Sequence, residues 1–219
     1  MLILGSGSPR RRGLLSLLGV EFTVQTSDID ESSLPGESPQ DYVLRLAIGK
    51  SMKINPLSEG RLVVITADTA VVNDDQILGK PRSEQDAIDM LLKLRDRSHM
   101  VISGLAVRDS KTDEIFTDLC TTLVKMRNYG EQEIKDYVNS GDPMDKAGAY
   151  AIQHSGFDPV AQVTGCYANV VGLPLCHLAQ IFDLIGEDFQ RETIRDCRIN
   201  GNYHCRLVEK INTLDADYS

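Results

Sequence analysis

The amino-acid sequence predicts an α/β fold organised as one large domain. Short, continuous apolar runs alternate with segments whose apolar residues recur at helical spacing, as expected for strands that alternate with helices. The chain has 219 residues, of which 42% are hydrophobic and 25% are charged, and this is an ordinary globular composition. A chain of this length buries about 70% of the surface that it exposes when unfolded, so we expect a stable core without disulfides.

Two cap signals mark helix starts in the first half of the chain. At Ser8-Pro9 and again at Ser38-Pro39, serine is a favoured N-cap and proline a favoured first helical residue. A continuous apolar run over 62–67 resumes at 70–72, beyond Asp68. In chain order we expect a strand over 1–5, a helix from Pro9 to Gly19, a strand over 22–26, a helix from Pro39 to about Asn55, and strands over 62–72 and 77–78.

The second half predicts a long β-hairpin between helices. Ser83 is a third N-cap candidate, and two long apolar runs flank a polar turn at 109–113. After Gly186 the chain becomes polar, so we divide it into a domain over 1–186 and a C-terminal extension over 187–219, partly helical near 189–197. The expected elements are a helix over 84–94, strands over 100–107 and 115–126, a helix over 131–139, short strands over 150–152 and 169–171, and a helix over 174–185.

Composition and charge argue against several functional classes. The net charge of −9, from 23 basic and 32 acidic residues, is unlike a surface that coats nucleic acid, whose affinity comes from phosphate neutralisation. No apolar run reaches the roughly 18 residues of a membrane span, and the short apolar start does not resemble a signal peptide. The five cysteines form no CxxC pair that would indicate zinc. We expect a cytoplasmic protein without a nucleic-acid or membrane partner.

The segment over 5–12 combines the features of an anion site. It lies where a strand turns into a helix, and free backbone N–H groups together with the helix dipole attract negative charge there. Arg10 and Arg11 add forked donors that suit phosphate oxygens, although without a ligand they oppose the helix dipole. The segment lacks the Gly-Lys-Ser/Thr of a Walker P-loop. The alternative interpretation is a basic turn on the surface.

Asp68 is the second candidate because it interrupts an otherwise apolar strand. A buried carboxylate is costly unless it is paired or binds a metal, so Asp68 is a general base, a metal ligand or a structural residue at a strand end. Lys50 and Lys80 are candidate cations, although most lysines are solvated. Glu31 lies in an acidic loop and offers a hard oxygen ligand for Mg²⁺, and Gln153 ends a short apolar run.

Together these segments resemble the motifs of the Maf family of nucleoside triphosphate pyrophosphatases. The resemblance runs from Leu2 to about Ile185 and rests on six motifs in the family's order. Two positions differ from the family pattern: Arg95-Asp96-Arg97 replaces a small Ser-Gly turn, and His154 replaces a glycine. The motifs are Ser6-Gly7-Ser8-Pro9-Arg10-Arg11, Tyr42-Val43-Leu44-Arg45-Leu46-Ala47 with Lys50, Ala67-Asp68-Thr69, Gly79-Lys80-Pro81, Lys146-Ala147-Gly148-Ala149-Tyr150-Ala151-Ile152-Gln153 and Asn169-Val170-Val171-Gly172-Leu173-Pro174.

The resemblance implies a fold, a reaction and a set of site residues. The fold is an elongated mixed α/β sheet with helices, similar to inosine triphosphate pyrophosphatase, with two lobes around a central cleft and often a homodimer. The reaction is hydrolysis of a nucleoside triphosphate to the monophosphate and pyrophosphate with a divalent metal, Mg²⁺ or alternatively Mn²⁺ or Co²⁺. Asp68 matches the proton acceptor, and Glu31 and Asp68 are the metal candidates. The positions that match substrate contacts are Ser6, Arg10, Arg11, Lys50, Thr69, Lys80 and Gln153.

Gln153 carries the expectation about the base. The branch that resembles this chain has glutamine there and acts on dTTP and UTP, whereas a sister branch has glutamate and prefers 7-methyl-GTP. An amide offers a donor for O4 and an acceptor for N3–H of uracil or thymine, while a carboxylate only accepts. We therefore expect dTTP and UTP, with modified pyrimidine nucleotides as further candidates. The alternatives are a 7-methyl-GTP pyrophosphatase, a nucleotide-binding regulator of cell division without turnover, and a monophosphatase.

Overall fold

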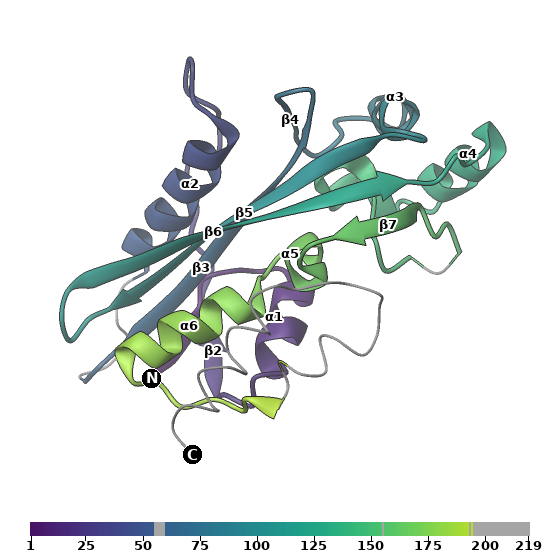
Figure 1. Cartoon of the computed structure of the whole chain (residues 1–219). Coiled ribbons are helices and arrows are strands. Elements are labelled where there is room, and N and C mark those ends of the chain that lie inside the picture. Colours follow the sequence, from purple (N-terminus) through teal and green to yellow (C-terminus); the bar gives the residue numbers. More distant parts are fainter. Residues whose placement is uncertain (55–59, 155, 193, 195–219) are drawn as a thin grey trace.

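A mixed sheet of seven strands runs through the molecule, with strands from both halves of the chain (Figure 1). The computed structural model describes residues 1–54, 60–154, 156–192 and 194. The strand order is β2-β1-β3-β5-β6-β7, with β4 paired to β3. β1 is parallel to β2 and β3, and the other pairs are antiparallel. The strands are β1 (Leu2–Leu4), β2 (Phe22–Val24), β3 (Val63–Asn73), β4 (Gln76–Leu78), β5 (Ser98–Asp109), β6 (Glu114–Met126) and β7 (Val160–Thr164).

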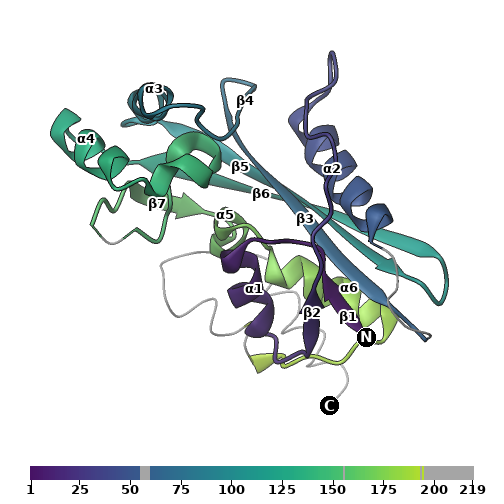
Figure 2. The same ribbon diagram turned by 180° about the vertical axis from the view of Figure 1, so that it is seen from behind.

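Helices cover both faces and one end of this sheet (Figures 1 and 2). α2 crosses one face over β3 and β5, α1, α5 and α6 pack on the other face, and α3 and α4 lie together at one end. Gly104 permits the close approach of α2, because a Cβ there would lie 2.6 Å from the backbone of Val43. The helices are α1 (Pro9–Ser16), α2 (Pro39–Lys53), α3 (Glu84–Leu94), α4 (Glu131–Asn139), α5 (Tyr167–Val171) and α6 (Leu175–Ile185), with short 3₁₀ helices at Asp142–Asp145 and Ala147–Ala149.

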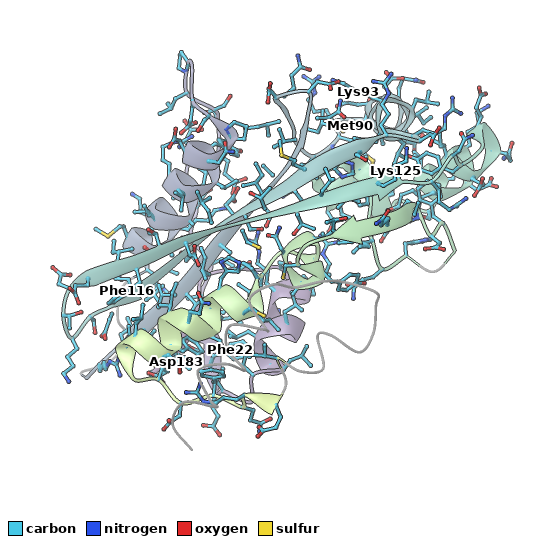
Figure 3. All side chains as sticks on the ribbon, viewed as in Figure 1. Phe22, Met90, Lys93, Phe116, Lys125 and Asp183 are labelled. Carbon is cyan, nitrogen blue, oxygen red and sulfur yellow. The ribbon has the colours of Figure 1, made fainter. Side chains whose placement is uncertain are left out.

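The hydrophobic core has two main parts, one toward each end of the sheet. The first joins β1, α1 and α6 around buried residues such as Leu15, and the second joins α3, α4 and β7 around residues such as Leu91. Figure 3 shows Phe22 and Phe116 at the α6 end and Met90 at the α3 end. These two parts of the core make the two lobes that the sequence analysis expects.

The observed hydrogen bonds confirm the predicted helix starts and the hairpin. Each of the serines before α1, α2 and α3 accepts a hydrogen bond from the backbone N–H three residues later. β5 and β6 pair in antiparallel register from Ser98↔Lys125 to Asp109↔Glu114. The mixed α/β fold is therefore as predicted.

The strand predicted over 150–152 is wrong. Gly148 and Ala149 have φ values of 70° and 60°, which turn the backbone just before this segment. Tyr150 is buried by the second part of the core and bonds His99 Nε2 through its hydroxyl at 2.8 Å. These residues have no strand partner among the described residues. Their apolar side chains are explained by packing against the core.

The strand predicted over 169–171 is also wrong, since these residues belong to α5. The Asn169 amide is buried and donates to Val101 O at 3.0 Å and Thr122 Oγ1 at 2.9 Å, which binds this short helix to the sheet. Three residues show no period, so burial alone does not separate a strand from a helix. β7, which pairs with β6, follows Pro159 and has no clear apolar alternation, and the sequence analysis does not predict it.

The start of the C-terminal extension packs on the first lobe. The Gln190 N–H donates to Leu18 O at 2.7 Å, and the Phe189 ring lies 5.9 Å from the Phe182 ring. Ile194 is buried in the same core. Of the helix expected over 189–197, residues 193 and 195–197 lie outside the described residues. Within the described residues, no helix combines the length and the apolar character that a membrane span requires.

Candidate active site

The site forms where one edge of β3 is open. On the side away from β5, pairing with β1 ends at Ile65, and pairing with β4 begins at Val71. Among the described residues, 66–70 therefore have no strand partner on that edge. Successive strand residues point to opposite faces, so Asp68 meets α2 while Thr69 meets α1, yet both line one cavity at the open edge.

Arg11 connects three parts of the chain at the start of α1. Its Nε donates to Gly172 O at 2.8 Å and its Nη2 to Thr69 Oγ1 at 3.1 Å, while Nη1 lies 3.4 Å from Ser6 Oγ. Burial lowers the pKa of Arg11, and the Asp68 carboxylate acts in the opposite direction. Arginine stays charged at any pH that proteins experience, so this corner keeps a positive charge.

Lys50 brings two carboxylates to one point. Its Nζ lies 2.5 Å from Asp68 Oδ1 and 2.7 Å from Glu31 Oε1. Lys50 and Asp68 are buried, whereas Glu31 is exposed. Burial raises the pKa of Glu31, but the hydrogen bond and the charge of Lys50 outweigh it, so the pKa lies below its ordinary value. The buried Asp68 is thus paired, as the cost of an isolated buried charge requires.

Two side chains of α2, which the sequence analysis names only as members of a motif, hold the Glu31 loop. Tyr42 donates through its hydroxyl to Glu31 O at 2.9 Å, and Arg45 Nη2 donates to Ser32 O at 3.0 Å. The hydrogen bond from Arg45 also lowers the pKa of Glu37 to about 2. Tyr42 and Arg45 are three residues apart and share one helix face, which is the sequence signal for this role.

Lys80 and Gln153 approach from the second lobe. Lys80 follows β4, and its charge contributes to the lowered pKa of Glu31. Gln153 is exposed at the cavity, in a turn that the His154 N–H closes by donating to Ala151 O at 3.2 Å. The two lobes therefore face each other across the open edge of β3.

A cavity of about 700 Å³ brings the predicted site residues together. This volume lies within the range of ordinary small-molecule sites. Arg10 and Arg11 line it, so they do not form a basic turn on an open surface, and Lys146 adds a further cation to the wall. The walls include every residue predicted for the site: Ser6, Arg10, Arg11, Glu31, Lys50, Asp68, Thr69, Lys80 and Gln153.

Ser103 is a supporting residue that the sequence analysis missed. It is fully buried on β5, and its Oγ lies 2.8 Å from Thr69 Oγ1, so it helps to orient the Thr69 hydroxyl toward Arg11. The signal in the sequence is a polar residue inside an apolar strand, the same signal that Asp68 gives.

The two departures from the family pattern lie beside the site rather than in it. Asp96 has a φ of 56°, the left-handed region, and the turn that contains it does not line the cavity. His154 Nδ1 accepts a hydrogen bond from the Phe157 N–H at 3.0 Å, so this ring stabilises the loop after Gln153.

Glu31 and Asp68 offer carboxylate oxygens, the ligand type that a hard divalent cation prefers. Both place an oxygen within 2.7 Å of Lys50 Nζ, and Mg²⁺ is usually held by one or two carboxylates together with substrate phosphates and water. In the described part of the chain, no group of three or more His, Cys, Asp or Glu side chains is placed to hold a metal ion. A cation at this position would need further ligands from a bound anion.

Comparison with known proteins gives strong sequence matches. The family model described as Maf-like protein matches residues 1–185. A protein of Syntrophotalea carbinolica named dTTP/UTP pyrophosphatase is 45% identical over 187 residues, which are 84% of each chain. A Geobacter sulfurreducens protein of the same name is 46% identical over 185 residues, covering 84% of this chain and 96% of the relative.

Solved structures give weaker matches. A HAM1 protein from Coxiella burnetii is 14% identical with a TM-score of 0.45, over 84% of this chain and 98% of that one. The Staphylococcus aureus Ham1 protein is 12% identical with a TM-score of 0.44, over 85% of this chain and 99% of that one.

Proposed function

Because the chain belongs to the Maf family, we propose that it is a nucleoside triphosphate pyrophosphatase that hydrolyses dTTP and UTP to the monophosphate and pyrophosphate. The observation that carries the proposal is the placement of Asp68 in a cavity that also holds the cations of both lobes. The names of the relatives, dTTP/UTP pyrophosphatase, support the choice of substrate.

The cations bind and orient the triphosphate. The start of α1 offers backbone N–H groups and a favourable dipole, and Arg10 and Arg11 add donors for phosphate oxygens. Lys50 and Lys80 approach from α2 and from the second lobe. Positive groups that are already in place stabilise the negative charge that develops on the phosphates during bond cleavage.

Asp68 orients and deprotonates the attacking water. Lys50 holds Oδ1, and Asp68 lines the cavity, so we assign Oδ2 as the acceptor for the water. The water attacks the α-phosphorus, a new P–O bond forms, and the bond to the bridging oxygen breaks with release of pyrophosphate. Glu31 and Asp68 would hold the divalent metal, which when bound supplies charge neutralisation at the phosphates.

We assign recognition of the base to Gln153. Gln153 is exposed and lines the same cavity as the turn that begins α1. The amide N–H donates to O4 of uracil or thymine, and the amide oxygen accepts from N3–H. A carboxylate at this position would only accept, which would suit the N1–H and N2–H₂ edge of guanine instead.

A panel of triphosphates with Mg²⁺ tests the function. We expect pyrophosphate release from UTP and dTTP with kcat/KM at least about tenfold above that for GTP, ATP or 7-methyl-GTP, in line with the substrates named for the relatives. Products are identified by chromatography. Orthophosphate in place of pyrophosphate would contradict the reaction, and a preference for 7-methyl-GTP would contradict the assignment of Gln153. Tight binding without product over hours would indicate a nucleotide-sensing regulator.

A further inference from the structure

We propose that Tyr137 is a positioning residue for base selection, because it holds both flanks of the turn that carries Gln153. Tyr137 lies on α4, and its side chain is almost fully buried, with 3% of its surface exposed. The inference rests on the proposed function, since it takes Gln153 as the residue that contacts the base.

The hydroxyl of Tyr137 has a defined direction. It donates to Asp142 Oδ2 at 2.7 Å, because a carboxylate only accepts, and it accepts from the Ala151 N–H at 3.0 Å. Burial raises the pKa of Tyr137, and the hydrogen bond to Asp142 raises it further, so the phenol keeps its proton at any working pH. The backbone N–H of Ala151, two residues before Gln153, is thus hydrogen-bonded to an acceptor with a fixed position.

The ring of Tyr137 holds the other flank of the turn. It meets the His154 ring edge to face at 4.7 Å between centroids, and it stacks on Phe157 at 4.4 Å with 14° between the planes. The turn itself is closed by His154 N–H donating to Ala151 O. Gln153 therefore lies between two residues that both contact Tyr137, which restricts where its amide can point.

Asp142 connects this arrangement to the cavity wall. Its Oδ1 accepts from Lys146 Nζ at 3.0 Å, and Lys146 is a buried residue that lines the cavity. The second carboxylate oxygen is the one that binds Tyr137. The Gln153 turn thus has a continuous hydrogen-bonded support that runs from the cavity wall through Asp142 and Tyr137.

Tyr137→Phe tests the proposal, because it removes the hydroxyl and keeps the ring. Tyr129→Phe is the matched control: Tyr129 is also buried, donates to Leu91 O at 2.8 Å, and contacts the same Phe157 ring, but does not touch the turn. Affinities for α,β-methylene UTP and α,β-methylene GTP are measured by calorimetry, so the result does not depend on turnover. Hydrogen exchange at the Ala151 amide reports directly on the turn.

In Tyr137→Phe we expect the ratio of UTP-analogue to GTP-analogue affinity to fall about tenfold, with exchange at Ala151 at least tenfold faster. The free energy of one hydrogen bond corresponds to about this factor. Tyr129→Phe should keep the wild-type ratio and exchange rate even if both variants melt earlier. An unchanged ratio or unchanged exchange in Tyr137→Phe overturns the proposal. If the wild type prefers the UTP analogue but releases no pyrophosphate from UTP, the proposed function fails, while the affinity ratio still decides the role of Tyr137.

Discussion

Asp68 is the residue whose surroundings most constrain the chemistry. It is buried, it interrupts an apolar strand, and its side chain pairs with the Lys50 ammonium at 2.5 Å. A buried carboxylate without a cation would be strongly destabilising, so Lys50 is required for Asp68 to stay in place as a charged group. The same pairing fixes one carboxylate oxygen of a residue that lines the cavity.

Replacing Asp68 with Asn should reduce kcat for UTP by about 10²–10⁴-fold, the usual contribution of a general base. An amide has nearly the same shape but does not accept the proton of water. Binding of α,β-methylene UTP should change by less than about tenfold, since the arginines and lysines remain. Steady-state kinetics and calorimetry measure the two effects.

Asp74→Asn is the control, because Asp74 is an exposed turn residue with a φ of 50° that asparagine tolerates. It should leave kcat unchanged. A value of kcat in Asp68→Asn close to that of the wild type would show that another group takes the proton.

At the scale of elements, an ion pair binds α6 to β6. His177 Nδ1 on α6 lies 2.6 Å from Asp118 Oδ2 on β6. Burial lowers the pKa of His177, but its hydrogen bonds to Asp118 and Cys120 outweigh burial and raise the pKa to about 10. His177 is thus protonated at neutral pH, and this helix is held to the sheet by a charged hydrogen bond as well as by apolar packing.

Asp118→Asn should lower the free energy of unfolding at pH 6 by about 2 kcal/mol, the order expected for a partly buried charged hydrogen bond. The pKa of His177 is raised on folding, so its contribution is fully present below the ordinary histidine pKa of 6.5 and is lost as pH rises toward 10. Urea unfolding between pH 6 and pH 10 should therefore show a smaller loss of stability in Asp118→Asn than in the wild type.

The control is Asp183→Asn, which removes an exposed ion pair with Arg191 and should change stability little at any pH. Equal pH dependence in wild type and Asp118→Asn would contradict the role of this pair.

The elements also show which local sequence signals are sufficient to predict a helix or a strand. Ser8-Pro9 and Ser38-Pro39 start helices because the serine oxygen satisfies a free N–H and proline has none to satisfy, and both effects act within one turn. The segment Asn169–Val171 gives a wrong strand prediction because the Asn169 side-chain amide donates to β5 and β6, which are distant in sequence. Local chemistry predicts an element when its hydrogen bonds are local.

At the scale of the whole molecule, two lobes meet across the open edge of β3. The first part of the core holds Leu15 and Phe182, and the second holds Leu91 and Tyr129. Residues from both lobes line the cavity, so the site exists only when both are folded. The homodimer implied by the family resemblance stays a prediction.

The first residues of the C-terminal extension should contribute to the stability of the first lobe. Glu187 pairs with Arg61 at 3.4 Å, Gln190 bonds Leu18, and Ile194 is buried. A chain that ends after Gly186 should therefore be less stable than one that ends after Ile194, by about 2–4 kcal/mol, because it loses the burial of Ile194 and part of that of Phe189.

Urea unfolding of the two shortened chains measures this difference, with the full chain as the reference. If the two shortened chains unfold at the same urea concentration, the contacts of 187–194 add nothing to the core, and the domain boundary proposed at Gly186 is supported.

The sequence by itself determined the α/β class, the helix starts and the long hairpin, and it supplied the candidate residues for chemistry. Those depend on composition, on hydrophobic period and on hydrogen bonds made within a few residues. Only the tertiary structure decided that Asp68 shares one cavity with Arg11 and Gln153, and that Ser103, Tyr42 and Tyr137 form hydrogen bonds with Thr69, Glu31 and Ala151 around it. These contacts join residues from separate elements, and they depend on the places where β1 stops and β4 starts along β3, which no local pattern specifies.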